Sequence, residues 1–352
     1  MVGRCYGRVF GLAPHERLLR QIDENQRLRL NHGEPMMGVA MNACALLDEA
    51  ALQWLFANPH QLLVAASGTP LAVGAPVEEL GEARAQLERG GTGSKAGGRV
   101  FVRKLRRTVD MLAVSLDECD PRAIERRLYR NVYKGVTDVV TRYVWPAPAF
   151  HVVRFCAAVG ISPNLVTFAG IVLMLAATLL FWQGEVAMGL AAGWAMTFLD
   201  TVDGKLARVT ATSSRFGNLL DHGTDILHPP LWWWAVTVGL ARQDSAAANA
   251  LWLSVWVILA TYVIGRVLEE VFKKRFGFNA YIWRRFDSRF RLIVSRRNIL
   301  LLILTLGLAV GQPTVSWFVA AGWSIASVLV QGWRFLAAVQ AARTAEVRPW
   351  LA

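Results

Sequence analysis

The sequence predicts an all-α polytopic membrane domain of six transmembrane helices, preceded by an interfacial amphipathic helix and a small cytosolic α/β domain. The first observation is composition: 54% of the 352 residues are hydrophobic and 18% are charged, against about 25% charged residues in an ordinary soluble protein. The second is distribution, because long apolar runs dominate from residue 164 onward. We expect the α/β domain over 1–110, a linker with the interfacial helix over 111–163, the membrane domain over 164–343 and a cytosolic tail over 344–352.

The N-terminal part alternates between strand and helix patterns. The runs at 36–46 and 60–74 suit buried strands, and "SGTP" within the second indicates a hairpin turn. The segments 47–59 and 77–90 carry an apolar stripe at helical spacing. We therefore expect a small α/β domain, without catalytic activity of its own.

The stretch "GGTGSKAGG" at 90–98 invites comparison with a phosphate-binding loop. A Walker loop has glycine directly before its lysine and serine or threonine after it, whereas here Ser94 precedes Lys95 and Ala96 follows. Glycine- and serine-rich composition by itself produces flexible coil. A flexible linker is therefore favoured over a nucleotide cradle.

Cysteine usage and the first residues indicate the compartment. The cysteines, Cys5, Cys44, Cys119 and Cys156, form no CxxC pair. We interpret them as free thiols in a reducing compartment rather than as a disulfide or zinc framework. The opening "MVGRCYGRVFGLAPHERLL" lacks the apolar core of a signal peptide, which predicts a cytosolic N-terminus.

The second half of the chain reads as interfacial and membrane-spanning helices. Residues 121–145 are basic and amphipathic, which suits a helix in the membrane interface, with a solvated connecting helix as the alternative. Hydrophobic segments of membrane-spanning character follow. They cover roughly 165–182, 186–207, 217–241, 247–272, 298–311 and 314–337.

Charge decides the predicted orientation of these segments. The links near 184, 244 and 312 hold one basic residue, Arg242, whereas the opposite side receives most of the remaining Lys and Arg of this half. Since cytoplasmic loops carry the Lys and Arg excess, we expect a multi-pass protein of the cell (inner) membrane with both termini and the aspartate cluster on the cytoplasmic side. The net charge of +12 would face anionic membrane lipids or a phosphorylated substrate, and no nucleic-acid-binding pattern is present.

Four aspartates interrupt the second and third apolar segments, in "TFLDTVDGKLARVTATSSRFGNLLDHGTDIL" at 197–227. Asp200 and Asp203 are three residues apart and Asp221 and Asp225 are four apart, so each pair shares a helix face. Two antiparallel helices joined by a short loop would bring the pairs together. Clustered carboxylates repel unless cations lie among them, and Mg²⁺ or Mn²⁺ suits a site built from oxygen ligands. A helix pair held by ion pairs with nearby basic residues is the alternative, which paired spacing at membrane depth disfavours.

Small residues accompany these carboxylates. Gly204 would let a ligand approach the backbone, Ala207 keeps the same face shallow one turn later, and Gly217 does likewise on the facing helix. Arg208 lies at a helix end, where it could meet a phosphate or a carboxylate.

The pattern Asp200-x2-Asp203-Gly204-x2-Ala207-Arg208-x8-Gly217-x3-Asp221-x3-Asp225 resembles the signature of the CDP-alcohol phosphotransferase (CDP-alcohol phosphatidyltransferase) family. Every position of that motif is present at its expected spacing. The resemblance covers roughly residues 120–343, including "SPNLVT" at the start of the first spanning helix. It implies six transmembrane helices, a cytoplasm-facing site and a homodimer.

The resemblance also implies an activity and roles for the motif. Members move a phosphoalcohol from a CDP-alcohol to an acceptor hydroxyl and release CMP, with two divalent ions, Mg²⁺ or Mn²⁺. Asp200, Asp203 and Asp221 would be metal ligands, while Asp225 would share the second ion and take the acceptor's proton. The CDP-binding residues would be Asp203, Gly204, Ala207, Arg208 and Gly217. Two metals can stabilise the entering and leaving oxygens of such a transfer.

The acceptor side is less specific in sequence. Arg266 lies within an apolar segment, where it could bind an acceptor or lipid phosphate, or else reach the interface as a snorkelling side chain. Arg296 and Arg297 precede the fifth helix and are the other candidates, with headgroup contact as the alternative. His222 and His228 flank Asp225 without metal-ligand spacing, which favours hydrogen-bonding support over ligation.

Several alternatives stay open at this level. The donor could be CDP-diacylglycerol or a soluble CDP-polyol, and the acceptor an inositol phosphate, a glycerol phosphate, another polyol phosphate or a lipid hydroxyl. The N-terminal region resembles, by strand and helix order, a degenerate nucleotidyltransferase domain; a regulatory or dimerisation domain is the alternative. A different class of function is a divalent-cation transporter, but such sites lie near the bilayer midplane between repeated halves, and no internal repeat is visible. A catalytically inactive scaffold is opposed by the intact motif.

Overall fold

The computed structural model spans residues 1–352 and describes all of them except 32–34, 96, 103–104, 213–214 and 352. The side chains of 24–31, 100, 215–222 and 225 also lie outside the description. The chain divides into two compact units. Unit 1 contains Met1–Gly135, Phe150–Ser162 and Lys205–Ser213, and unit 2 contains Val136–Ala149, Pro163–Gly204 and Ser214–Ala352.

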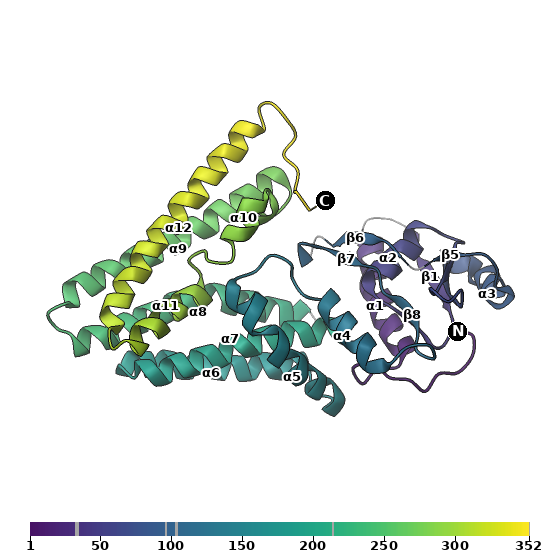
Figure 1. Ribbon diagram of the computed structural model, residues 1–352, viewed down its shortest axis with the longest axis horizontal. Helices are drawn as coiled ribbons and strands as arrows, with labels where there is room; N and C mark the ends of the chain where they lie inside the picture. The colour runs from purple at the N-terminus through teal and green to yellow at the C-terminus, as the bar shows by residue number, and fades with distance from the viewer. Residues whose placement is uncertain (32–34, 96, 103–104, 213–214, 352) are drawn as a thin grey trace. The chain divides into compact units, whose positions relative to one another are not determined.

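Unit 1 is built on a four-stranded sheet of order β1-β4-β3-β5, of which β1 and β5 are labelled in Figure 1. β4 pairs antiparallel with both β1 and β3, and β5 adds in parallel to β3. Two short antiparallel pairs, β2 with β8 and β6 with β7, complete the strands. The bounds are α1 Pro14–Asn31, β1 Met37–Met41, β2 Ala45–Leu47, α2 Glu49–Ala57, β3 Leu62–Val64, β4 Pro70–Pro76, the 3₁₀ turn η1 Val77–Glu79, α3 Leu80–Arg89, β5 Ser94–Lys95, β6 Arg99–Val102, β7 Arg107–Asp110, β8 Ala113–Ser115 and α4 Pro121–Asn131.

Alternating side chains let helices cover both faces of the sheet. Met41 and Leu63 pack with α2, whereas Ala40 and Val64 pack with α3 on the other face. Gly74 in β4 lets α2 approach closely, because a Cβ there would lie 2.5 Å from the Leu55 carbonyl oxygen. The predicted α/β character, the β3–β4 hairpin and the helices α2 and α3 are therefore confirmed.

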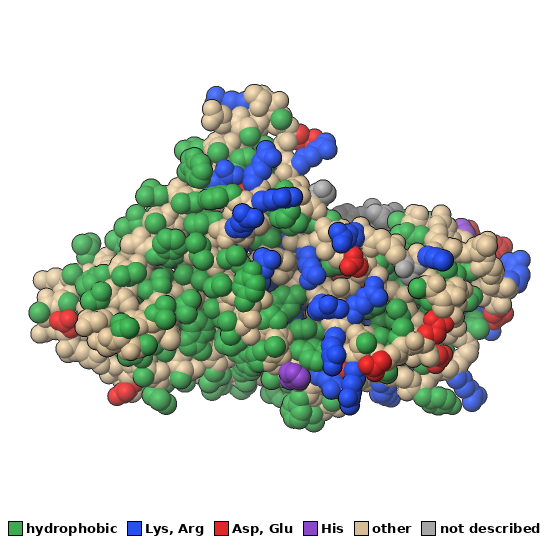
Figure 2. All heavy atoms as spheres, in the orientation of Figure 1, with side chains coloured by type: hydrophobic (Ala, Val, Ile, Leu, Met, Phe, Trp, Pro, Cys, Tyr) green, Lys and Arg blue, Asp and Glu red, His purple; other side chains and the backbone are tan. Residues whose placement is uncertain are grey.

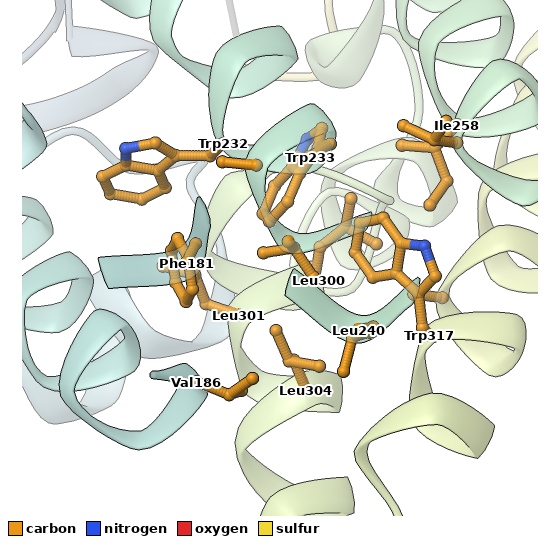
Figure 3. Packing of buried hydrophobic residues seen from close by; sticks show 14 of the residues in the cluster. Phe181, Val186, Trp232, Trp233, Leu240, Ile258, Leu300, Leu301, Leu304 and Trp317 are labelled. Carbon is orange, nitrogen blue, oxygen red and sulfur yellow. The ribbon is translucent and has the colours of Figure 1, made fainter. Parts of the chain in front are cut away.

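Unit 2 is a bundle of long helices. α6 packs on α8, α8 on α9, α9 on α12 and α12 on α11. Buried aromatic and aliphatic side chains from several of these helices form its core, with Trp232, Trp233 and Trp317 as the largest members (Figure 3). The bounds are the π-helical turn η3 Val140–Val144, α5 Pro146–Val159, α6 Pro163–Gln183, α7 Val186–Val209, α8 Arg215–Gln243, α9 Ala248–Phe276, the 3₁₀ turn η4 Ala280–Ile282, α10 Arg285–Phe290, α11 Arg297–Ala309 and α12 Pro313–Ala341, of which α5 and α7 continue into unit 1.

Each of the hydrophobic segments predicted in this half is a helix: α6, α7, α8, α9, α11 and α12. Among the described residues, three of them, α6, α9 and α12, are long and apolar enough by themselves to cross a membrane. Figure 2 shows hydrophobic side chains covering much of the visible face of these helices. The number of spans stays a prediction for α7 and α8, which carry the motif, and for α11, whose 13 residues measure about 20 Å along the axis.

Three expectations need correction. Residues 121–145 are not one helix, because α4 ends at Asn131 and buries Ile124 and Leu128 inside unit 1. Ser94 and Lys95 form the edge strand β5 rather than a flexible linker. Their backbone N–H and C=O groups can pair with β3 whatever their side chains are. Cys5 and Cys44 form a disulfide with Cα atoms 5.0 Å apart.

The Cys5–Cys44 disulfide was not predicted, because only the tertiary structure brings these two cysteines together. The Val2 N–H donates to the Met41 carbonyl, and the Ala43 N–H donates to the Val2 carbonyl. These bonds place the N-terminal residues beside the loop after β1. The two cysteines are 39 residues apart in sequence, and no local pattern marks them. Cys119 and Cys156 are free thiols, as expected.

Asp48 is expected to make the stability of unit 1 depend on pH. Its Oδ1 caps α2 by accepting from Ala51 N at 2.9 Å, and burial raises the pKa of this carboxyl from 3.8 to about 6. The folded state then binds the proton more tightly than the unfolded state, so this group's contribution is present below about pH 4 and lost as pH rises to about 6. Asparagine can also cap a helix.

The free energy of unfolding of Asp48→Asn, relative to wild type, should therefore rise by about 3 kcal/mol between about pH 4 and pH 7. Hydrogen exchange of the α2 amides, with both proteins compared at each pH, measures this difference. The exposed Asp110→Asn serves as control. A difference that stays constant with pH would contradict the raised pKa.

Candidate active site

The first half of the aspartate motif lies on α7 in unit 2. Alanine, glycine and long apolar residues make "VAMGLAAGWAMTFL" a good membrane-type helix, and Asp200 and Asp203 follow within the same helix. Both residues line a small, partly open cavity. The other lining residues are Thr167, Gly170, Ile171, Met196 and Thr224. The predicted shared face of Asp200 and Asp203 is thus present, and it faces a cavity.

Asp203 is held by the start of α6. Thr167 Oγ1 donates a hydrogen bond of 2.7 Å to Asp203 Oδ2. Thr167 is also the last residue of "SPNLVT", so that motif places a hydroxyl against a motif carboxylate. Asp203 is only 6% exposed, which means that its charge needs such partners.

Asp200 is held by the start of α11. Arg297 Nη2 donates to Asp200 Oδ2 at 2.5 Å, and Arg297 Nη1 lies 3.1 Å from His228 Nε2. His228 Nδ1 lies 2.6 Å from the carbonyl oxygen of Thr224. Because a carbonyl only accepts, Nδ1 carries the proton and Nε2 is the acceptor for Arg297. A continuous chain of hydrogen bonds therefore links Asp200 to the backbone of α8.

Two prolines shape α8 at this point. Pro229 and Pro230 lie inside the helix and lack N–H donors. The carbonyl of Ile226, four residues before Pro230, is instead satisfied by Tyr262 Oη at 3.1 Å. The ring of Trp232 meets His228 edge-to-face with centroids 5.0 Å apart. A side chain of α9 thus satisfies a carbonyl that Pro230 leaves without a donor in α8.

Two residues that line this pocket, Asp200 and Asp203, carry carboxylates. Mg²⁺ and Mn²⁺ prefer oxygen ligands of this kind. The residues that would hold such ions are Asp200 and Asp203. The hydrogen bonds from Thr167 and Arg297 would orient these ligands, as outer partners do in metal sites.

The second half of the motif lies mostly outside the described side chains. Gly217, Asp221, His222 and Asp225 belong to α8, but their side chains are not described. Thr224, between the two aspartates in sequence, lines the same cavity as Asp200 and Asp203. The predicted roles of these four residues stay predictions.

The predicted CDP-binding residues fall on both units. Gly204 belongs to unit 2, while Ala207 and Arg208 belong to the end of α7 that lies in unit 1. Arg208 Nε donates to the Val132 carbonyl at 3.1 Å. Lys205, three residues before Arg208 on the same helix, is buried and lies over the ring of Tyr133.

The three acceptor candidates have different surroundings. Arg266, on α9, lies over the ring of Tyr262 at 6.0 Å. Arg296 forms an ion pair with Glu269 and lies over the ring of Tyr281. Burial by itself disfavours the charge of Arg296, but the Glu269 carboxylate outweighs it and raises the pKa of this guanidinium. Arg297 instead contacts Asp200, so the structure connects it to the motif directly.

Asp138, Asn298 and Arg291 form a set of interacting buried polar residues that the sequence did not indicate. Asn298 Nδ2 donates to Asp138 Oδ1 at 3.0 Å. Burial raises the pKa of Asp138, but the charge of Arg291 and these hydrogen bonds lower it below its ordinary value. Burial lowers the pKa of Arg291 to about 10. Asp138 precedes α5 while Arg291 precedes α11, and no local spacing relates the two segments.

Comparison with known proteins identifies the family of the domain that carries these residues. Residues 160–325 match the model of the CDP-alcohol phosphatidyltransferase family. This part of the chain carries a domain of that family.

Individual relatives are more distant. The archaetidylinositol phosphate synthase of Pyrococcus horikoshii is 36% identical over 101 residues, which is 28% of this chain and 52% of that protein. The chain therefore matches about half the length of this curated relative. The Mycobacterium tuberculosis phosphatidylinositol phosphate synthase PgsA1 with CDP-DAG bound is 19% identical, with a TM-score of 0.42 over 53% of this chain and 92% of that one. Its complex with manganese and citrate has the same identity and TM-score, over 53% and 88% of the two chains. This structural similarity is too low to assign a ligand to the chain.

Replacing Thr167 by valine is expected to slow turnover about tenfold and to weaken divalent-cation binding, because Asp203 loses the hydrogen bond that orients it. Thr167→Ser keeps the hydroxyl and should stay near wild type. Calorimetric titration with Mn²⁺, alongside CMP release, measures both effects. Equal Mn²⁺ affinity in Thr167→Val and Thr167→Ser would show that the Thr167 hydroxyl does not orient Asp203.

Proposed function

We propose that this chain is an integral-membrane transferase that moves a phosphoalcohol group from a CDP-alcohol to an acceptor hydroxyl and releases CMP. The observation that carries the proposal is the meeting of Asp200 and Asp203 at one cavity, within residues that match this family. The resemblance of the complete motif supports the same activity. It also supports a homodimer.

We assign the metal ligands to Asp200, Asp203 and Asp221, with Asp225 sharing the second ion. Two divalent ions, Mg²⁺ or Mn²⁺, would stabilise the charge that develops on the diphosphate oxygens when bound. Thr167 and Arg297 orient the two carboxylates on α7. Asp225 would take the proton from the acceptor hydroxyl, which requires hydrogen-bond reach and a suitable pKa.

Gly204, Ala207, Arg208 and Gly217 are proposed to accommodate the CDP moiety together with Asp203. Small residues allow close approach of a ligand to a helix backbone. The distribution of Lys and Arg supports a site that opens on the cytoplasmic side of the membrane.

For the acceptor, Arg266, Arg296 and Arg297 are the proposed phosphate contacts. The curated relative is named for an inositol phosphate lipid, which supports a phosphorylated polyol as acceptor for this chain. Arg296 already forms an ion pair with Glu269, so an acceptor phosphate would share this guanidinium with that carboxylate. Arg297 is the nearest to the motif, through Asp200.

The reaction run in reverse tests the proposal whichever two alcohols the enzyme uses. Purified full-length protein would be incubated with CMP, Mg²⁺ and a total extract of the source cells, and new CDP-alcohols identified by mass spectrometry. CDP-diacylglycerol would identify a phospholipid synthase, and a soluble CDP-polyol would identify polyol-phosphate chemistry. Absence of any CDP product with both Mg²⁺ and Mn²⁺, under conditions where the protein is folded, would contradict the proposal.

A further inference from the structure

The C-terminal end of α7 lies in unit 1, with an unusual set of hydrogen-bond partners. Thr210 N donates to Leu206 O at 3.0 Å and Thr212 N to Ala207 O at 2.9 Å, as the chain turns at Ala211 with φ of 49°. This is the hydrogen-bonding pattern of a left-handed helix cap, a position that glycine usually occupies. Carbonyls in the last turn of a helix need partners from outside the helix.

Two arginines of α1 supply these partners. Arg17 Nη2 donates to the carbonyl of Val209, and Arg20 Nη1 donates to the carbonyl of Thr210 at 3.0 Å. They are three residues apart and so share one face of α1. Both place positive charge at the negative end of the α7 dipole, which is favourable.

Because Arg17 is buried, its guanidinium has little access to water. The side chain is 2% exposed, and its Nε has no hydrogen-bond partner within the described residues. Burial lowers the pKa of Arg17 to about 10, while the charge of Asp48 acts in the opposite direction. A guanidinium buried at such cost still carries its charge at neutral pH, and its described hydrogen bond goes to α7.

A second segment of unit 1 holds the same turn. Arg208 Nε donates to the Val132 carbonyl at 3.1 Å, and Lys205 lies over the ring of Tyr133. The last turn of α7 is therefore held from α1 and from the residues directly after α4. Residues 205–213 belong to the same compact unit as the N-terminal domain.

These residues lie between the two halves of the motif. Asp200 and Asp203 precede them on the continuous helix α7, and α8, which carries Asp221 and Asp225, begins at Arg215. We propose that the N-terminal domain positions the motif: Arg17 and Arg20 clamp the end of α7 and thereby fix the register between its two aspartate pairs. Arg17 is the main positioning residue. This inference rests on the proposed function, in that it takes the aspartates as the divalent-cation site.

Binding of Mn²⁺ alone tests the clamp without any substrate. The full-length protein in detergent would be titrated with Mn²⁺ and free Mn²⁺ followed by electron paramagnetic resonance, for wild type, Arg20→Met, Arg20→Lys and Arg17→Met. Arg84→Met, an exposed arginine on α3 of the same unit, is the control. Hydrogen exchange of residues 205–212 would report the mobility of the clamped turn, and the fold of the variants.

We expect Arg20→Met to weaken Mn²⁺ binding several-fold and Arg17→Met by about tenfold or more, in the range found for residues that orient metal ligands. Faster exchange over 205–212 should accompany both changes. Arg20→Lys should recover most of the affinity, and Arg84→Met should match wild type. A role in stability alone would change exchange and leave Mn²⁺ affinity of the folded protein unchanged.

Failure of the clamp and failure of the metal site give different results. If Arg20→Met and Arg17→Met are folded and bind Mn²⁺ as wild type does, the clamp is wrong and the aspartate site stands. If wild type itself binds no Mn²⁺, the metal premise of the proposed function is wrong, and the clamp inference with it.

Discussion

Asp203→Asn is expected to reduce CMP-forming turnover by about 1,000-fold or more, because a neutral amide cannot supply the charge that a divalent cation needs from this position. The substitution is nearly isosteric, and Asn Oδ1 can still accept the 2.7 Å hydrogen bond from Thr167. The fold should therefore survive. Asp203 is buried, so neutralising it would lower rather than raise the cost of burial.

Three measurements separate catalysis from folding in this variant. CMP release gives turnover, Mn²⁺ titration gives cation affinity, and the thermal unfolding midpoint gives stability. Asp244→Asn is a matched control. The Asp244 carboxylate accepts a hydrogen bond from Ala247 N just before α9, and Asp244 does not line the cavity. Turnover within tenfold of wild type in Asp203→Asn would remove Asp203 from the metal site.

Arg297→Met is expected to destabilise unit 2 by about 3 kcal/mol, because it removes the arginine that is paired with the largely buried carboxylate of Asp200. Arg297 and Asp200 are 14% and 25% exposed at their side chains. His228, which is 1% exposed, would also lose the donor to its Nε2. Turnover should fall by about 100-fold, since Asp200 would lose the contact that orients it.

Adding Asp200→Asn to Arg297→Met separates the two effects. The double variant should recover much of the lost stability, because no unpaired carboxylate remains, but none of the activity. Arg289→Met, an exposed arginine on α10, controls for the loss of a surface charge. Wild-type stability in Arg297→Met would mean that the Asp200–Arg297 pair does not contribute to the fold.

The sequence predicted the helices of unit 2 well, and its reasons were physical. An apolar run such as 165–182 was predicted to be a helix, because a helix satisfies its backbone groups within the segment, and α6 covers Pro163–Gln183. The alternation of strands and helices in the N-terminal domain was equally legible, because hairpin turns and apolar stripes are local signals. α1 and the β6–β7 pair were not predicted, since their residues lack a strong apolar pattern.

Some features of the candidate site were also predicted from local spacing, and others were not. Motif spacing alone predicted that Asp200 and Asp203 share a helix face, and the structure places both at one cavity. His228 was predicted to support the site by hydrogen bonding, and it does so through Thr224 and Arg297. Arg297 was predicted as an acceptor contact, which stays a prediction, and the structure adds contacts of Arg297 with Asp200 and His228 that the sequence did not indicate.

The sequence by itself determined the family motif and the existence of the long apolar helices, because each depends on residues within a few turns of one another. Tertiary structure alone decided which side chains meet across the fold. Arg297 and Asp200 are 97 residues apart, and Arg17 and Val209 are 192 apart. Such pairs depend on how helices are rotated and connected, and hydrophobic periodicity sets which face is buried without naming the polar partner that lies opposite it.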